Sequence, residues 1–216
     1  MFIRFLLQGK YFVHSIVFGQ KNLFATNAIV SASIGFLGDA IQQNYEIYRR
    51  YSKRNLNKSN RESDLWQEIC EQYNWVRASH MAIAGLTTGV ATHYWYRLLE
   101  RFYPSKQNNL WMLFKLVLVD QIIYSPFNLL IYFSTLSICE RSGLKRFEEE
   151  LIEKGFKDIY VVEWLIWPPA QMINFSVIPY RYRVLFDNLM ALIFDIYGPY
   201  VKYKNQSKHQ NDDAQR

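Results

Sequence analysis

Residues 164–183 read WLIWPPAQMINFSVIPYRYR, and the first 17 of them carry no charged side chain. Three other stretches, residues 22–38, 78–96 and 121–139, also lack Asp, Glu, Lys and Arg and are 17 to 19 residues long. A helix needs ~20 residues to cross a hydrocarbon core of ~30 Å. The sequence therefore predicts an all-α protein, an integral membrane bundle of about four transmembrane helices.

Aromatic residues support this prediction better than bulk composition does. Hydrophobic residues make up 50% of the 216 residues and the mean hydropathy is -0.16, which does not distinguish a membrane protein from a soluble one. Several of the 6 Trp and 16 Tyr residues, however, stand where a predicted span ends, as in the aromatic belts of membrane proteins. The belt candidates are Tyr45, Tyr94, Trp95, Tyr96, Trp111, Trp164 and Tyr180.

The segments outside the spans are polar. Residues 1–21 are a basic leader without acidic residues, which fits either a mitochondrial targeting segment or an uncleaved amphipathic approach to the first span. The membrane domain is expected over residues 22–203, with an exposed loop at 45–71. Apolar residues at helical spacing between 141 and 163 predict an amphipathic surface helix. The polar tail, residues 204–216, is expected to be disordered.

The predicted loop is strongly basic. Its six basic side chains are Arg49, Arg50, Lys53, Arg54, Lys58 and Arg61. Such a cluster suits contact with RNA or with anionic lipid headgroups. Alternatively, it only sets the orientation in the membrane through the positive-inside rule.

Small and polar residues recur every three or four positions in the first span and so share one helical face, which we expect to point into the bundle. They are Asn27, Ser31, Gly35, Asp39 and Gln42. In the second span, Gly85 and Gly89 form a small-xxx-small pair that permits close helix packing, and His93 continues the same face.

The third and fourth spans also carry polar residues. Asp120, beside Gln121, should need a hydrogen-bond donor from a neighbouring helix. Pro168 and Pro169 each lack an amide donor, which predicts a break or kink close to Gln171 and Asn174. The polar groups of all four spans could hold helices together, line a water-filled conduit or bind a partner.

The pattern Trp167-Pro168-x-x-Gln171-x-x-Asn174-Phe175-x-x-x-Pro179-x-x-x-Arg183 resembles the C-terminal signature of the Mpv-seventeen family, the family of the 22-kilodalton peroxisomal membrane protein. Earlier blocks resemble the family in the same order, so that the resemblance extends from about Asn22 to Tyr203. The signature residues, taken together, are Asp39, Gln42, His93, Asp120, Gln121, Trp167, Pro168, Gln171, Asn174 and Arg183.

This resemblance implies a small organelle membrane protein. Residues 93–96 and 115–121 are most similar to a branch that is linked to the mitochondrial inner membrane and to assembly of its ribosome. The branch implies a membrane-bound factor that supports mitochondrial ribosome assembly and translation. Several family members are regarded as channels, so the alternative is a channel for small solutes or ions, and the alternative location is the peroxisomal membrane. The expected partners are the lipid bilayer, a mitochondrial ribosomal subunit (its protein or RNA) and a second copy of the chain.

The sequence gives little reason to expect catalysis. It contains no GxGxxG, P-loop, HExxH or GxSxG pattern, and its four His residues lack metal-ligand spacing. Cys70 and Cys139 are isolated, which argues against a disulfide framework or a zinc site. We therefore predict that the chain is not an enzyme and has no catalytic residues, cofactor or metal.

Overall fold

The computed structural model describes residues 19, 21–54, 62–102, 110–141, 143–152 and 160–193. Every element in these ranges is helical, which confirms the predicted all-α class. The tail at 204–216, nearly all of the leader, Lys58 and Arg61 lie outside the described residues.

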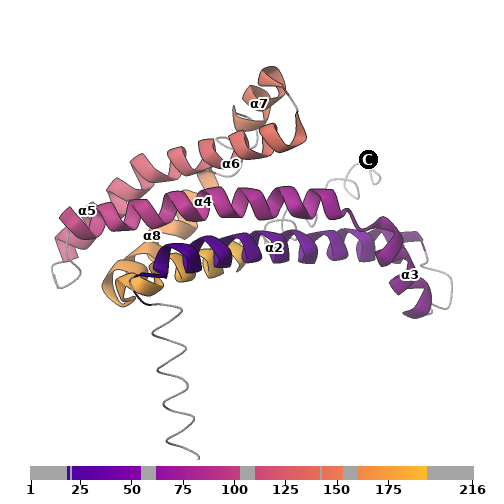
Figure 1. Cartoon of the computed structure of the whole chain (residues 1–216), viewed down its shortest axis with the longest axis horizontal. Helices are drawn as coiled ribbons and strands as arrows, with labels where there is room; N and C mark the ends of the chain where they lie inside the picture. The colour runs from indigo at the N-terminus through magenta and orange to yellow at the C-terminus, as the bar shows by residue number, and fades with distance from the viewer. Residues whose placement is uncertain are drawn as a thin grey trace, which may run out of the picture.

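Two long antiparallel helices, α2 (Leu23–Arg54) and α4 (Trp75–Phe102), lie side by side along the length of the molecule (Figure 1). The short helix α3 (Glu62–Gln72) lies between them in the chain. Asn74 caps the start of α4, because its side-chain oxygen accepts the backbone N–H of Arg77 at 2.9 Å. The α2–α4 pair makes the most extensive contact between elements in the described part of the fold.

The exposed loop predicted at 45–71 is wrong over most of its length. Helix α2 has 32 residues and continues to Arg54, and α3 occupies most of the remainder. The segment from 45 to 54 contains no Gly or Pro to end the helix, and Ile47 and Tyr51 are buried. These two residues extend the four-residue spacing that the first span already showed.

On the other side of α4 runs a continuous helical segment made of α5 (Leu110–Val119), the π-helix η1 (Asp120–Tyr124) and α6 (Ser125–Glu140) (Figure 1). In η1, the N–H of Ser125 bonds to the carbonyl of Asp120, five residues earlier. Pro126 follows directly, and its missing N–H prevents a regular α-helical bond at that point. The wider turn buries both Asp120 and its neighbour Gln121.

The helix α7 (Leu144–Glu150) has no buried residue, as expected of a surface helix. Residues 153–159 of that predicted helix lie outside the described residues, and its last residues belong to α8 (Val161–Ser176). Of the predicted break or kink, the break is wrong, because α8 continues through Pro168 and Pro169. A 3-10 turn, η3 (Tyr180–Tyr182), then leads into a helix over residues 183–193.

Many polar side chains are buried inside this bundle, and many large apolar side chains are exposed on it. The buried set includes Asn27, Asp39, Gln121 and Asn174 among others, whereas Ile29, Phe127, Leu165 and many similar residues are exposed. Two helical segments, Leu23–Arg54 and Leu110–Glu140, are long and apolar enough to cross a membrane, with hydropathies of 1.3 and 1.5 in their most apolar windows. The count of four spans remains a prediction.

The predicted aromatic belt needs a correction. Tyr94, Trp111 and Trp164 are at least 40% exposed, as belt residues should be. Tyr96 is instead 1% exposed, and the Trp95 indole donates to a buried carboxylate. These two aromatic residues therefore belong to the interior of the bundle.

Candidate functional site

Three glycines bring the backbones of α2 and α4 into close contact. A Cβ atom at Gly85 would lie 2.5 Å from the Ser31 carbonyl oxygen, and one at Gly35 would lie 2.6 Å from the Met81 carbonyl oxygen. At Gly89 it would lie 2.2 Å from the Ser31 hydroxyl oxygen. The predicted small-residue packing is confirmed, and no side chain larger than hydrogen fits at these positions without a shift of the helices.

One end of this interface is held by an ion-pair cluster. The Asp39 carboxylate lies 2.8 Å from Nε of Arg77, and Glu46 lies 3.2 Å from the same guanidinium group. The Gln43 amide donates to Asp39 at 2.6 Å, and its oxygen accepts the Asn74 N–H at 2.7 Å. Burial alone would lower the pKa of Arg77, but the hydrogen bond to Glu46 and the charge of Asp39 outweigh it and raise the pKa. Asp39 therefore has the partner that a buried carboxylate requires.

The sequence pattern placed Gln42 on the buried face of α2 with Asp39, but in the structure Gln43 lies there. Gln43 is 4% exposed, whereas Gln42 is only partly buried and donates to Glu46 on the same helix. A step of four residues from Asp39 leads to Gln43, so the helical spacing itself contained the correct signal.

The opposite end of the interface carries His93. Its Nδ1 lies 2.9 Å from the Asn27 amide nitrogen, and both residues are buried. An amide nitrogen donates and does not accept, so Nδ1 is the acceptor and the ring hydrogen is on Nε2. This contact links the first and second predicted spans, as the shared face of each had indicated.

The other side of α4 makes a hydrogen-bonded network with α8 and the helix at 183–193. The Tyr96 hydroxyl donates to the Asp187 carboxylate and accepts from the amides of Gln171 at 3.0 Å and Asn174 at 3.1 Å. Both amides also donate to Asp187, at 3.2 and 3.0 Å. Four polar side chains from three helices thus share one buried centre.

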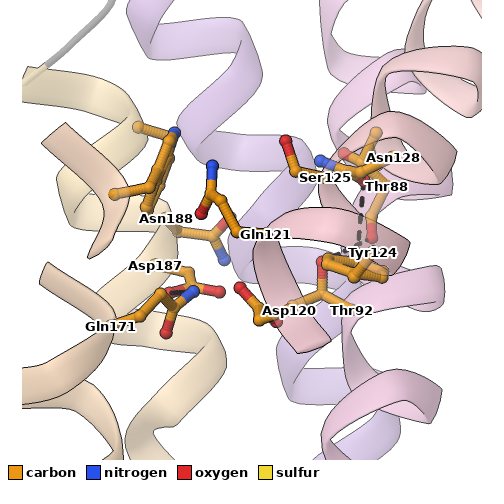
Figure 2. A pocket seen from close by; sticks show the side chains of 12 residues that line it. Thr88, Thr92, Asp120, Gln121, Tyr124, Ser125, Asn128, Gln171, Asp187 and Asn188 are labelled. Atoms are coloured by element: carbon orange, nitrogen blue, oxygen red, sulfur yellow. Dashed lines mark hydrogen bonds between the residues drawn. The ribbon is translucent and has the colours of Figure 1, made fainter. Parts of the chain in front are cut away.

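A cavity of about 120 Å³ adjoins this network (Figure 2). It lies between α4, η1 with the start of α6, α8 and the helix at 183–193, and it is partly open to the outside. The lining residues are Thr88, Thr92, Asp120, Gln121, Tyr124, Ser125, Asn128, Trp167, Gln171, Asp187, Asn188 and Ala191. At about 30 Å³ per water molecule, the cavity has room for about four waters.

Two carboxyl groups and a free amide give the cavity its chemical character. Asp120 accepts the Trp95 indole N–H at 2.7 Å, which confirms that it needs a donor from another helix. The Gln121 side chain is 1% exposed, yet its Nε2 has no hydrogen-bond partner in the described structure. Figure 2 shows Gln121 between Asn188 and Ser125, with Asp120 and Asp187 facing each other below it. A water or a polar solute in the cavity would satisfy this amide.

The lining also restricts what the cavity can bind. None of the twelve lining residues is Lys or Arg, so nothing there balances a bound anion. Within the described ranges, no three His, Cys, Asp or Glu side chains are arranged to hold a metal ion. Water, neutral polar solutes and monovalent cations are therefore the ligands that this lining suits.

The remaining predicted residues lie around these centres. Trp167 lines the cavity, and Pro168 occupies the adjoining turn of α8. Arg183 is 3% exposed and pairs with Glu100 at 3.2 Å. Sequence reasoning missed Asp187 as a site residue, although an acidic residue within an apolar stretch was a usable signal.

The described part of the basic cluster lies on the last turns of α2. Arg54 forms an ion pair with Glu68 of α3, and Arg50 and Lys53 line an open hollow of about 460 Å³ with Arg54 and Gln72. Arg49 also lies on these turns. These four residues of the cluster are therefore presented by a helix and not by a loop.

Comparison with known proteins identifies relatives across most of the chain. The model of the Mpv17 / PMP22 family matches residues 137–198. PXMP2/4 family protein 3 of Dictyostelium discoideum is 26% identical over 80% of this chain and 80% of its own. Protein SYM1 of Saccharomyces cerevisiae is 26% identical over 87% and 86%. Peroxisomal membrane protein 2 of Bos taurus is 33% identical over 51% and 55%. No solved structure matches.

The name of the bovine relative places that protein in the peroxisomal membrane, which is one of the two locations that the sequence suggested. The family match covers α8, which carries Gln171 and Asn174, and continues through the segment with Asp187. The resemblance proposed from the sequence is confirmed at this level. Residues 137–198 of the chain thus match the Mpv17 / PMP22 family, and its similarity to proteins of that family extends over most of its length.

Proposed function

We propose that this protein is a non-enzymatic protein of the mitochondrial inner membrane that provides a path for small cations or neutral polar solutes. The observation that carries the proposal is the partly open cavity between α4, η1, α8 and the helix at 183–193. It combines Asp120 and Asp187 with the unpartnered amide of Gln121 and contains no basic residue.

The two sides of α4 suggest where such a path would run. Contact between the α2 and α4 backbones at the glycines leaves no room for a solute on that side. The side that faces η1 and α8 is polar and hollow, and Thr92 and Tyr124 add hydroxyl groups to it. The path would therefore pass between α4 and the segment of Asp120, Gln121 and Gln171.

We further propose four spans. Buried polar and exposed apolar side chains are the arrangement that a lipid solvent favours, because lipid-facing polar groups would lack partners. The mitochondrial membrane is preferred to the peroxisomal one because the first 38 residues contain no acidic side chain.

Reconstitution into liposomes tests the path directly. We expect purified protein to conduct small cations in preference to anions of similar size, and D120N to reduce that preference because it replaces a carboxyl group of the cavity lining by an amide. Q121L should reduce flux while the protein stays folded. The matched control is Q42L, which changes the same residue type outside the cavity. Equal cation and anion flux in all variants would contradict the proposal.

The second candidate is a membrane-bound factor that supports mitochondrial ribosome assembly and translation. It rests on the similarity of residues 93–96 and 115–121 to the branch of Mpv-seventeen-like protein 2, and on the basic end of α2. There, Arg50 and Lys53 line a hollow open to the outside. RNA phosphate groups or acidic ribosomal proteins suit such a surface.

Sedimentation with mitochondrial ribosomal subunits separates the two candidates. If Arg50 and Lys53 contact RNA, R50Q/K53Q should lose co-sedimentation, and wild-type binding should fall steeply with salt, since each neutralised phosphate of a duplex releases about 0.9 counterion. The control is R97Q/R101Q, which removes the same charge from the far end of α4. Unchanged co-sedimentation of R50Q/K53Q would exclude recruitment through this surface.

A further inference from the structure

A second cavity, of about 440 Å³, lies where the start of α2, the end of α4 and η3 meet. Its lining residues are Leu23, His93, Arg97, Glu100, Arg101 and Tyr180. These residues stand at the ends of the predicted first, second and fourth spans. The cavity therefore lies at one membrane surface, away from the cavity of Asp120 and Gln121.

Two arginines give this second cavity a positive charge. Arg97 and Arg101 are four residues apart on α4, so their side chains share one face, and both are exposed. Neither has an ion-pair partner among the described residues. Glu100 does not neutralise them, because the buried Arg183 pairs with it at 3.2 Å.

The uncharged polar groups of the lining add donors. Because Nδ1 of His93 accepts from Asn27, the His93 ring contributes an N–H donor on its other nitrogen. The Tyr180 hydroxyl is a further donor. Two guanidinium groups and two neutral donors suit an anion with several oxygen atoms, and phosphate is such an anion.

The surroundings indicate that the phosphate belongs to a lipid. Large apolar side chains that are chain neighbours of the lining residues are exposed, namely Phe24 at 42%, Leu98 at 47% and Phe102 at 65%, and the Phe24 ring packs against that of His93. They would contact acyl chains while the arginines hold the headgroup, an arrangement known from basic pockets between transmembrane helices. A free phosphate ion has no acyl chains and would make no contact with these apolar side chains.

We propose that this second cavity binds the phosphate group of an anionic phospholipid headgroup. The site is independent of the proposed path through the first cavity. It would fix the end of α4 relative to η3 and α2 at the membrane surface.

The test measures binding of short-chain phosphatidylglycerol to full-length protein in a neutral detergent. Short-chain phosphatidylcholine and inorganic phosphate serve as separate arms. We expect R97Q/R101Q to bind phosphatidylglycerol about thirtyfold more weakly, because each basic residue near such a headgroup contributes about a factor of five. The control R141Q/K145Q removes two exposed charges near the start of α7 and should bind like the wild type.

Each outcome of the binding measurements either supports or overturns the proposal. Preference for phosphatidylglycerol over phosphatidylcholine, lost only in R97Q/R101Q, supports it. Equal loss in both double variants would mean general charge attraction and overturn it. Inorganic phosphate that binds as tightly as phosphatidylglycerol would overturn the lipid assignment. Thermal unfolding without lipid checks the fold, which should be unchanged because both arginines are exposed.

Discussion

Helix α4 packs against its neighbours differently on its two sides. Toward α2, glycines allow backbone contact. Polar groups on this side form an ion-pair cluster at one end and the Asn27–His93 contact at the other, with the Ser31 hydroxyl between them accepting from Asn188 at 2.7 Å. Toward η1 and α8, the contact is made by long polar side chains that leave a cavity. Small residues thus let two helices pack without a cavity between them, whereas long amide and carboxyl side chains leave a cavity between helices.

The largest expected effect is on the closed side. G85V would place its Cβ 2.5 Å from the Ser31 carbonyl oxygen, and a backbone atom cannot move away cheaply. Overpacking costs about 1–3 kcal/mol where side chains can adjust, so we expect at least the upper end of that range. Thermal unfolding and the monodisperse yield in detergent measure it. S79V adds similar bulk at an exposed position of α4 and should be tolerated; equal damage by both would contradict the close-contact interpretation.

A smaller loss is expected at the ion-pair end of the same interface. R77M leaves the buried Asp39 without its cationic partner. Breaking a buried pair costs about 3–5 kcal/mol, and we expect about 2 kcal/mol here because Arg77 is partly exposed. The double variant D39N/R77M should recover part of the unfolding free energy. Additive losses would show that the two residues are not coupled.

On the open side, Q171L/N174L should cost no more than R77M. The variant removes the four hydrogen bonds that Gln171 and Asn174 donate to Tyr96 and Asp187, and at roughly 0.6 kcal/mol each we expect a loss of about 2 kcal/mol. The same variant should alter reconstituted conductance, since Gln171 lines the cavity. If conductance changes while stability does not, Gln171 and Asn174 act only in the path. If stability falls while conductance does not change, they act only in holding the helices together.

The smallest effect is expected for Q42L. Gln42 contacts only Glu46 among the described hydrogen bonds, and surface changes of this kind are usually within about 0.5 kcal/mol. Q43L removes bonds to both Asp39 and the backbone of Asn74, and should cost about 1 kcal/mol. Chemical unfolding of both variants compares the neighbours directly, and equal losses would contradict the assignment of Gln43 to the interface.

Helical spacing predicted the closed interface well because it depends on sequence-local geometry. The interval of four residues identified Asn27, Ser31, Gly35 and Asp39, and the glycine pair of α4 meets them. The end of α2 was misplaced because basic side chains were interpreted as a loop. They are good helix formers and continue the helix beyond the apolar segment.

The open site was less predictable because it is assembled from distant segments. Asp187 is 91 residues from Tyr96, and no local pattern reveals which polar residues of different helices will meet. Trp95 and Tyr96 looked like interfacial aromatics, although both use their polar atoms inside the bundle. The π-helix was missed as well, since Pro126 indicates an irregularity without specifying its form.

The wider turn of η1 holds one residue more than an α-helical turn, because its hydrogen bond spans five residues instead of four. The turn absorbs this additional residue without changing the direction in which the flanking helices face. Deleting one residue from 120–124 should therefore give a regular helix in which Leu113, Leu116 and Val117 of α5 stay in the core. The same deletion would remove the turn that brings both Asp120 and Gln121 to the cavity. The irregular turn thus shapes the cavity and is not required for the packing of α5.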